Sequence, residues 1–355
     1  MEKFEVALAA RVPQSSGFPL LTEVDRLVVD SVSYTEELNR PGTSALTCPL
    51  RAMSFAVKTR LSDLATFPSE VWIYYGSERV WAGEIQTLGV SDQTVSLSCV
   101  GLLGYTFRMG VTSDLVYTTV DQFSIAKGLV NHWQGQPYGN YGIDTTAIGL
   151  SGENRDRTYL RSELHNVGTR LSELGAVENG FDTWVSASTR ELMLQYPFRG
   201  LDLSGSVFLD DRNIDSASIA ISVAPSDLVS DGGFTGSSQS ASGTGSSLYS
   251  ARASTAVRTS YGRSWGSANF DGVSVQATLD GHGDAYLAAR AAQLFQPGVT
   301  VVPRKGCEIN DLHPGDVVSY AFDAGLGLQT GVFRISKVTV SAGQDGKQRL
   351  GLEFV

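Results

Sequence analysis

Apolar and polar residues alternate along the first hundred positions of the chain, which predicts strands. A period of two places successive side chains on opposite faces of an extended backbone, as in a half-buried strand. Phe4–Val12 follows this pattern with its apolar residues at even positions, and segments 27–34 and 44–50 are similar. Asn39–Gly42 separates the second and third segments, and its proline and glycine suit a turn. We therefore expect three strands before residue 51.

The clearest predicted sheet lies within residues 71–100. Val71–Tyr75 is rich in β-branched and aromatic residues, which favour strands, and Gly76–Arg79 turns the chain. Val80–Leu88 runs back, and Thr94–Val100 alternates apolar with hydroxyl side chains. These runs together predict a β-meander.

A helical period replaces the alternation after residue 120. Asp121 precedes an apolar stripe with helical spacing, and its carboxylate can accept hydrogen bonds from first-turn amides, so we expect a helix over Gln122–Trp133. A second helix is predicted by apolar residues spaced i, i+4, i+7, i+11 and i+14: Leu160, Leu164, Val167, Leu171 and Leu174. Segments 181–185 and 191–198 should follow as a hairpin.

The C-terminal half combines a glycine- and serine-rich region with further strands. Asn213–Ala224 is expected to be a strand. Gly232–Ala251 has no charged residue and 12 glycines and serines among its 20 positions, so we expect a flexible or partner-ordered loop. Alanines with helical spacing predict a third helix from residue 285, which Pro297–Gly298 ends. A closing unit with a tight turn at Asp345–Gly346 is expected from four strands: 299–302, 317–322, 331–340 and 349–354.

The predicted elements divide the chain into four segments and give a β-rich α+β fold class. Residues 1–115 are expected to form an N-terminal β-barrel-like domain, and 116–205 an α/β domain of two helices and a hairpin. Residues 206–298 form a connecting region with the Gly/Ser-rich loop 232–251 and a helix. Residues 299–355 supply C-terminal β-barrel-like strands.

The charge of the chain excludes several classes of function. The chain has 355 residues, with 27 Lys and Arg against 37 Asp and Glu, and a net charge of −10. Nucleic-acid binding needs a basic surface that neutralises phosphates, so we expect no sequence-specific nucleic-acid binding. No apolar run approaches the length of a membrane span, and Val6–Ala10 is too short for the core of a signal sequence. We therefore expect no membrane anchor.

Residue types that often carry chemistry do not cluster along the sequence. Three cysteines are far apart and are expected to be buried free thiols: Cys48, Cys99 and Cys307. Four histidines lack the spacing of a metal site: His132, His165, His282 and His313. Asp280–Asp284 has too few carboxylates for a calcium loop, so we interpret it as a turn that caps the helix starting near residue 285.

The remaining candidates for catalysis or sugar binding are also weak. Asp210 and Asp211 are adjacent, and neighbours in an extended chain point to opposite sides, so they are not expected to share a proton. Tyr138 and Tyr141, in a glycine-rich loop, suit stacking on a sugar, although ordinary loop packing is the favoured interpretation. The chain has no phosphate-binding loop. We predict no catalytic, cofactor-binding or metal-binding residue, and no cofactor.

Four stretches of the chain follow one another in an order that is typical of a known family. They are VWIYYGSERVWAGEIQTLGVSDQTVSLSCVGLLGYTFRM, then DQFSIAKGLVNHW with YLRSELHNVGTRLSELGAVENGFDTWVS, then SYGRSWGS, and finally DLHPGDVVSY with GVFRISKVTV. In this succession the chain resembles the tail-tip or baseplate hub proteins of long-tailed bacteriophages, the minor tail proteins of actinobacterial siphophages. The resemblance covers nearly the whole sequence.

The resemblance implies a fold, partners and a location. The fold would combine tail-tube-like β-barrel domains with smaller α/β domains, and three chains would form a homotrimeric ring. The implied partners are the distal tail protein, the tape measure protein, the tail tube and the central fibre or tip proteins. The location would be the virion, at the phage tail tip, after assembly in the host cytoplasm. No catalytic residue is carried over from the family.

Two other functions stay open from the sequence. One is a different tail component, either a hexameric distal tail protein or a receptor- or cell-wall-binding module. Such a module would bind sugar through exposed aromatic residues such as Tyr138, Tyr141 or Trp265. The other is a hydrolase on a β-rich scaffold, with Asp210 or Asp211 as the candidate residue.

Overall fold

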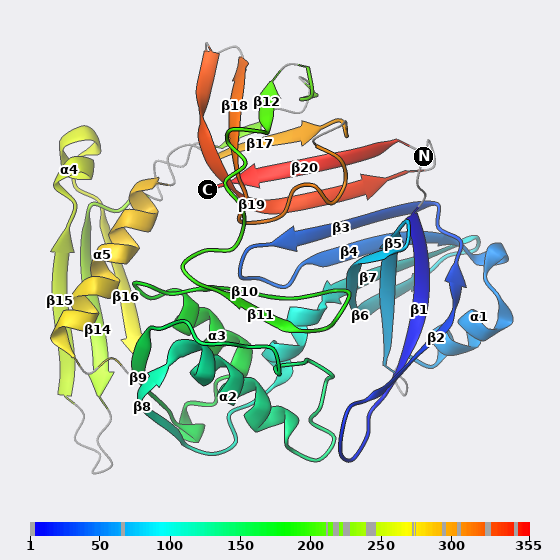
Figure 1. Cartoon of the computed structure of the whole chain (residues 1–355), viewed down its shortest axis with the longest axis horizontal. Coiled ribbons are helices and arrows are strands. Elements are labelled where there is room, and N and C mark those ends of the chain that lie inside the picture. Colours follow the sequence, from blue (N-terminus) through cyan, green and yellow to red (C-terminus); the bar gives the residue numbers. More distant parts are fainter. Residues whose placement is uncertain are drawn as a thin grey trace.

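A computed structural model gives the β-rich α+β fold that the sequence predicts (Figure 1). It describes residues 4–64, 68–210, 212–215, 220–222, 228–238, 246–271, 273, 275–292, 296–303, 307–323, 328–343 and 347–355. Twenty strands and five α-helices lie within these residues. Among the described helices, none has the length and apolar character needed to cross a membrane.

A sheet of 13 strands forms the frame of the molecule. Its main path runs in the order β13-β17-β20-β19-β3-β4-β7-β6-β5-β1-β2, and β18 and β12 extend from β19. The strands are β1 (Phe4–Val12), β2 (Leu20–Leu27), β3 (Ser31–Glu37), β4 (Thr43–Pro49), β5 (Ser69–Tyr75), β6 (Glu78–Val90), β7 (Thr94–Gly101), β12 (Phe208–Asp210), β13 (Ala220–Ser222), β17 (Gln296–Val301), β18 (Val317–Asp323), β19 (Leu328–Ala342) and β20 (Gln348–Phe354). The predicted meander and the four closing strands are confirmed.

The pairing of β3 with β19 joins the two ends of the chain in one sheet. These strands are antiparallel, with Thr35 opposite Thr339 and Tyr34 opposite Val340. In Figure 1 the red C-terminal strands lie above the blue N-terminal ones. One hydrophobic core accordingly contains side chains from both ends, including Leu8, Leu46 and Leu352. The boundaries of the four predicted segments stay predictions.

Two details of the N-terminal strands differ from the sequence prediction. Strand β1 is buried on both faces, not on one: Val6 and Leu8 belong to the first core, and Ala7 and Ala9 belong to a second one. The alternating pattern does not predict burial of the second face, because that face carries alanines, which are small enough to pack closely under another layer. The segment 27–34 is not one strand, because β2 ends at Leu27 and β3 begins at Ser31.

An α/β layer packs on the second face of β1 through this second core. Its elements are η2 (Leu102–Arg108), β8 (Leu115–Asp121), α2 (Gln122–Gln134), β9 (Asn154–Tyr159), η3 (Arg161–Glu163), α3 (Val167–Gly175), β10 (Asp182–Val185) and β11 (Leu192–Gln195). The predicted capping of α2 is confirmed, since Asp121 Oδ1 accepts a hydrogen bond of 2.9 Å from the Phe123 amide. The predicted hairpin is confirmed as β10 and β11. A short η1 (Leu50–Ala52) and α1 (Phe55–Ser62) lie beside β2.

The predicted helix over residues 160–174 is wrong in its first half. Strand β9 holds the chain extended as far as Tyr159, because it pairs with β8. Leu164 is left-handed, with φ 55°, and is 90% exposed. Helix α3 starts only at Val167, where Asn166 accepts a hydrogen bond of 2.7 Å from the Thr169 amide.

A three-stranded sheet and two helices form a separate layer, coloured yellow in Figure 1. Its elements are β14 (Asp231–Ser238), β15 (Ser246–Ala253), α4 (Thr255–Tyr261), β16 (Trp265–Asp271) and α5 (Gln276–Ala292). The predicted Gly/Ser loop 232–251 is therefore wrong where the structure describes it, since most of it forms the hairpin β14–β15. Residues 239–245 lie outside the described residues.

Close packing explains why the glycines of this layer form strands and a helix. Phe234 of β14 is fully buried, and a Cβ added to Gly283 of α5 would lie 2.6 Å from its ring. The glycine therefore lets the helix approach the sheet. The predicted turn at Asp280–Asp284 is wrong, because this segment lies inside α5, which starts nine residues before Ala285. Helix α5 ends at Ala292, and Pro297–Gly298 belong to β17.

The strand predicted over Asn213–Ala224 is confirmed only in pieces. Ile214 bridges to Val301, and β13 covers Ala220–Ser222. Residues 216–219 and 223–224 lie outside the described residues, as does the predicted turn at Asp345–Gly346. The predicted burial of the three cysteines is confirmed, and all three are free thiols.

Candidate functional site

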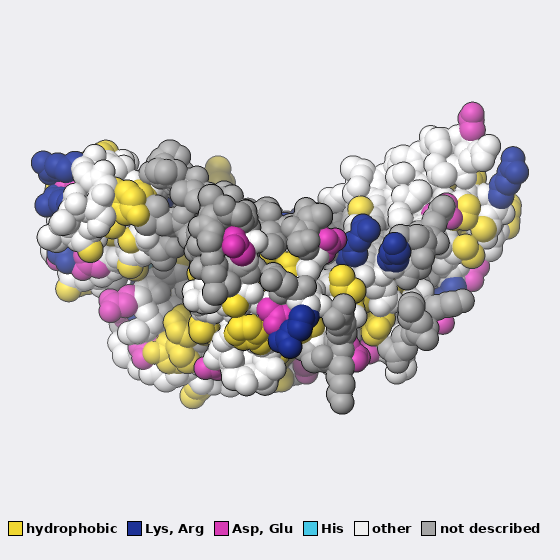
Figure 2. All heavy atoms as spheres, turned by 90° about the horizontal axis from the view of Figure 1, so that it is seen from above, with side chains coloured by type: hydrophobic (Ala, Val, Ile, Leu, Met, Phe, Trp, Pro, Cys, Tyr) yellow, Lys and Arg dark blue, Asp and Glu magenta, His cyan; other side chains and the backbone are white. Residues whose placement is uncertain are grey.

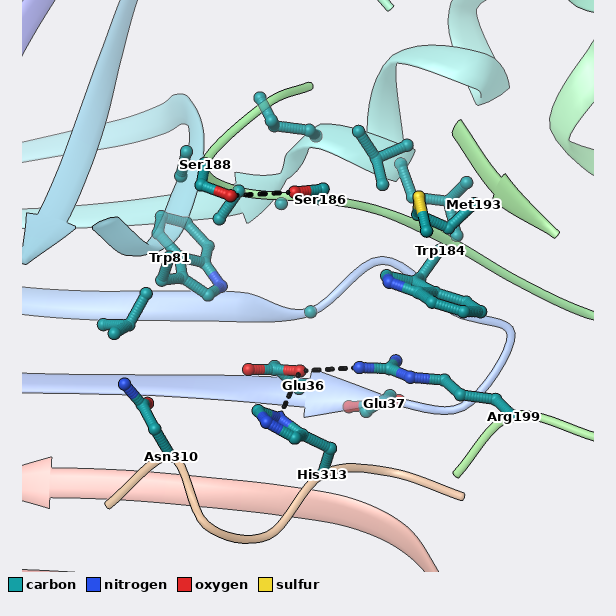
Figure 3. Close-up of a pocket in the computed structure, with 18 of the residues that line it drawn as sticks. Glu36, Glu37, Trp81, Trp184, Ser186, Ser188, Met193, Arg199, Asn310 and His313 are labelled. Carbon is teal, nitrogen blue, oxygen red and sulfur yellow. Dashed lines mark hydrogen bonds and ion pairs between the residues drawn. The ribbon is translucent and has the colours of Figure 1, made fainter. Parts of the chain in front are cut away.

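A pocket of about 770 Å³ lies where distant segments of the chain meet. Its walls come from β3, the start of β6, the start of η2, the β10–β11 hairpin, and the loops at 199–201 and 310–316. In Figure 3, Glu36 and Glu37 enter from β3, whereas Trp184 and Met193 face them from the hairpin. The pocket therefore lies at the junction between the large sheet and the α/β layer.

Glu36 is the charged centre of the pocket. Its Oε2 accepts a hydrogen bond of 3.1 Å from Arg199 Nη2 and lies 3.8 Å from His313 Nδ1 (Figure 3). Burial raises the pKa of Glu36, but His313 and Arg199 outweigh it, so the net pKa lies below its ordinary value. The neighbouring carboxylate of Glu36 raises the pKa of His313 despite partial burial. The arrangement favours a charged carboxylate between two cations.

Asp182 ties three separate segments together beside this centre. It is buried and accepts hydrogen bonds from Asn39 Nδ2 at 2.7 Å and from the Arg199 amide at 2.6 Å. It also forms an ion pair with Arg334 of β19. The guanidinium of Arg199 lies 4.4 Å above the ring of Trp184. This network joins the turn after β3, the 199–201 loop and β19 to the hairpin through one carboxylate.

The Pro-Gly-Asp stretch of the sequence forms the turn before β18. Asp316 accepts hydrogen bonds of 2.8 Å from the amides of Leu201 and His313. Gly200 and Gly315 have φ of 102° and 101°, a conformation that favours glycine. Their backbones are in direct contact, so a Cβ on Gly200 would collide with Gly315. The turn thereby holds the floor of the pocket against the 199–201 loop.

A second buried network holds the hairpin from its other side. Glu70 is completely buried and accepts hydrogen bonds of 2.8 Å from Arg190 Nη1 and from Tyr105 Oη. Burial raises the pKa of Glu70, but Arg190 outweighs it, so the net pKa is lowered. Arg79 donates to the Ala187 carbonyl at 2.6 Å and lies 4.6 Å from the ring of Trp72. The hairpin is therefore fixed by charged groups at both of its faces.

We call the network of Glu36, Asp182, Arg199 and Arg334 the joint, because it connects the large sheet to the α/β layer beside the pocket. Glu36 and Arg199 in the wall of the pocket bind each other, and no group of three or more His, Cys, Asp or Glu among the described residues is arranged to hold a metal. The face drawn in Figure 2 shows acidic and basic side chains interspersed with hydrophobic ones. Such a surface fits contacts with polar protein surfaces.

The four histidines that the sequence analysis considered do not form one site. His132 Nε2 lies 2.9 Å from Thr112 Oγ1 and accepts from the Thr112 amide, and His165 precedes the cap of α3. His282 is buried in α5 and stacks on Phe270 at 4.6 Å. His313 alone lies in the pocket.

The other sequence candidates have structural contacts or lie on the surface. Asp210 caps its own turn, accepting from the Arg212 amide at 2.9 Å, and Asp211 lies outside the described residues. Tyr141 stacks on Tyr105 with ring centroids 4.9 Å apart, which confirms ordinary packing for this residue. Tyr138 and Trp265 are each 65% exposed.

Sequence reasoning missed the charged residues of the joint. Glu36, Asp182, Arg199 and Arg334 are separated by up to about 300 positions and share no sequence motif. A charged residue in a strand or loop does not by itself indicate its partner. The sequence contains more arginine than lysine, and this excess is its nearest indication of buried ion pairs, because arginine tolerates burial and binds carboxylates in a defined geometry.

Solved phage tail proteins have a similar fold over nearly their whole length. The tail protein from Neisseria meningitidis MC58 is 15% identical, with a TM-score of 0.61, and the match covers 99% of this chain and 96% of that one. The 43 kDa tail protein of prophage MuSo2 from Shewanella oneidensis is 13% identical, with a TM-score of 0.62 and coverage of 99% and 97%. No protein-family model matches the sequence. No curated protein gives a significant match.

A more distant structure links the fold to secretion machinery. The Escherichia coli c3393 protein is a component of the type VI secretion system that exhibits structural similarity to the T4 bacteriophage tail proteins gp27 and gp5. It is 12% identical to this chain, with a TM-score of 0.51, and the match covers 93% of this chain and 73% of that one. At these identities the likeness shows the fold, which is that of phage tail proteins.

Proposed function

We propose that this chain is a structural hub of a phage tail tip, where it forms a ring that joins the tail tube and the distal tail ring to the tip or central fibre. The observation that carries the proposal is the shared fold with phage tail proteins over 99% of the chain. The similarity of the Escherichia coli protein to gp27 and gp5 supports the baseplate over other parts of the tail. The actinobacterial siphophage origin stays part of this proposal.

The joint around Asp182 supports a role that transmits force. A ring at the end of a tail is loaded when the tail attaches, and separate layers must not slide past one another. The ion pair between Asp182 of the β10–β11 hairpin and Arg334 of β19 connects the α/β layer to the large sheet in this chain. The mutual pairing of charges in the pocket likewise favours a structural role without enzymatic activity.

The proposed partners are further copies of this chain in a homotrimer, the distal tail protein, the tape measure protein, the tail tube and the central fibre or tip proteins. The tip of the β1–β2 hairpin supports self-association, because it exposes apolar side chains. Val12 lies opposite Leu20 in the pairing, and Phe18 and Leu20 are 62% and 58% exposed. Exposed apolar groups at one place are typical of protein contacts. The proposed location is the virion, at the tail tip.

The mass of the purified chain in solution tests the proposal. We expect light scattering to give a trimer at high protein concentration. We also expect Leu20→Asp to shift the mass towards the monomer, and the control Leu164→Asp to leave it unchanged, since Leu164 is exposed far from the hairpin tip. A stable hexamer would support a distal tail protein instead. A wild-type monomer at every concentration would contradict self-driven ring formation.

A further inference from the structure

The three-stranded sheet β15–β14–β16 has one covered face and one open face. On the covered face, Phe234 and Phe270 pack under α5, and Ser250 donates to Asp280 of that helix at 2.5 Å. Strand residues of the opposite parity point away from α5. The described residues that do so are Asp231, Gly233, Thr235, Tyr249, Ala251, Ala253, Trp265, Ser267 and Asn269.

Two aromatic side chains converge on the middle of this open face. Tyr249 lies opposite Thr235 on one side of β14, and Trp265 lies opposite Asp231 on the other. Gly233 is midway between those two positions, so the side chains lean towards each other across it. A Cβ on Gly233 would lie 2.7 Å from Trp265 Cζ2 and 3.1 Å from Tyr249 Oη. The glycine therefore lets both rings lie low on the sheet, as one platform.

Both rings of the platform remain open to solvent. Trp265 is 65% exposed and Tyr249 is 58% exposed, and Trp265 is the most exposed tryptophan of the chain. Large aromatic rings are normally buried, because removing their surface from water is favourable. Two such rings left exposed side by side indicate a ligand.

The surroundings of the platform indicate which ligand it suits. Apart from Asp231, the other described outward side chains are small or carry hydroxyl and amide groups, and Thr235 Oγ1 donates to Asn269 Oδ1 at 2.9 Å. No exposed Leu, Ile, Val, Phe or Met lies among them, whereas protein interfaces combine aromatic with aliphatic side chains. The carboxylate of Asp231, at the end of the face, is already bound by Arg258 and Arg263. The platform itself is therefore flat and aromatic, and the charged groups near it, Asp231, Arg258 and Arg263, form one cluster at the end of the face.

We propose that Trp265 and Tyr249 form a binding platform for a neutral glycan. The apolar C–H face of a sugar ring stacks on an aromatic ring, while its hydroxyl groups hydrogen-bond to hydroxyl and amide side chains such as those of Thr235 and Asn269. The two rings, on strands either side of β14, are placed to hold neighbouring sugar units of one chain. The platform lies outside the pocket described above, whose walls include none of its residues.

Titration of tryptophan fluorescence with hexasaccharides of N-acetylglucosamine and of glucose tests this proposal on the full chain. We expect at least one of the two probes to change the emission in a saturable way. Trp265→Ala should abolish binding of that probe by calorimetry, and Tyr249→Ala should weaken it about tenfold. Both residues are exposed, so their variants should keep the circular dichroism and melting temperature of the wild type.

Tyr138→Ala is the matched control, because Tyr138 is equally exposed but lies in a loop outside this sheet. It should bind the probe like the wild type. The proposal is overturned if neither hexasaccharide binds at millimolar concentration, or if Tyr138→Ala weakens binding as much as Trp265→Ala. A loss of self-association in Trp265→Ala, without any sugar binding by the wild type, would assign the face to a second copy of the chain instead.

Discussion

The large sheet and the yellow three-stranded layer of Figure 1 are stabilised in different ways. The large sheet buries aliphatic side chains from both ends of the chain and is locked by charged groups such as Asp182 and Arg334. The small layer depends on few side chains, with Phe234 at its centre and glycines that allow close approach. A Gly/Ser-rich segment can therefore be ordered when one large side chain fills the space that its glycines leave.

The largest effect should come from removing the centre of the small layer. Phe234→Ala deletes a fully buried ring, and truncations of this kind cost about 4 kcal/mol. We expect amide protection to be lost in β14, β15 and β16 while the large sheet keeps its protection. Hydrogen exchange measured by mass spectrometry resolves the two regions. Equal loss of protection in both would show that they unfold as one unit.

Breaking the joint of the large sheet should be the next strongest change. Asp182→Ala leaves Arg334 without its carboxylate in a partly buried site, and such a loss typically costs about 3 kcal/mol. Denaturant unfolding should show a lower midpoint for the main transition. Asp202→Ala is the control, since Asp202 is exposed and binds only Ser204 of its own turn. If both variants unfolded alike, the network would not contribute to stability.

Acid should weaken the small layer through His282. Burial, with Arg157 and Arg155 of β9 nearby, lowers the pKa of this histidine to about 4. The unfolded chain binds a proton at about pH 6.5, so stability falls as the pH drops below that value. The loss should reach roughly 2 kcal/mol at pH 5 for two-state unfolding. His282→Gln should flatten this dependence in hydrogen exchange of α5, and an unchanged pH profile would exclude His282 as its source.

The sequence could predict what depends on local patterns. The meander, the capped helix α2 and the hairpin β10–β11 follow from periods and turn residues inside each segment. The prediction of a helix before Val167 was wrong because the pairing of β9 with β8 outweighed the helical spacing of the apolar residues. The joint around Asp182 lay beyond prediction, since its partners are brought together only by tertiary pairing such as that of β3 with β19.

Gly283→Ala should have a smaller effect, and it tests whether close packing at this position outweighs the higher helix propensity of alanine. Gly283→Ala gains helix propensity but places a Cβ 2.6 Å from Phe234 and 2.7 Å from Arg252. Because the collision outweighs the gain, we expect a net destabilisation of about 1 kcal/mol for the small layer. Gly149→Ala, with no atom within 4 Å of the new Cβ, should be neutral. Stabilisation by Gly283→Ala would show that α5 can shift away from the sheet.

The smallest effect concerns His313, whose pH dependence should be opposite to that of His282. The carboxylate of Glu36, 3.8 Å from His313 Nδ1, raises the pKa of His313, so the stabilising contribution of His313 is complete below about pH 6.5 and is lost as the pH rises through the folded pKa. His313 is half-exposed, and solvent screening limits the contribution to below about 1 kcal/mol. The stability difference between the wild type and His313→Asn should therefore be larger at pH 6 than at pH 8.5. A difference that is equal at both pH values would mean that the imidazole acts through packing and not through its charge.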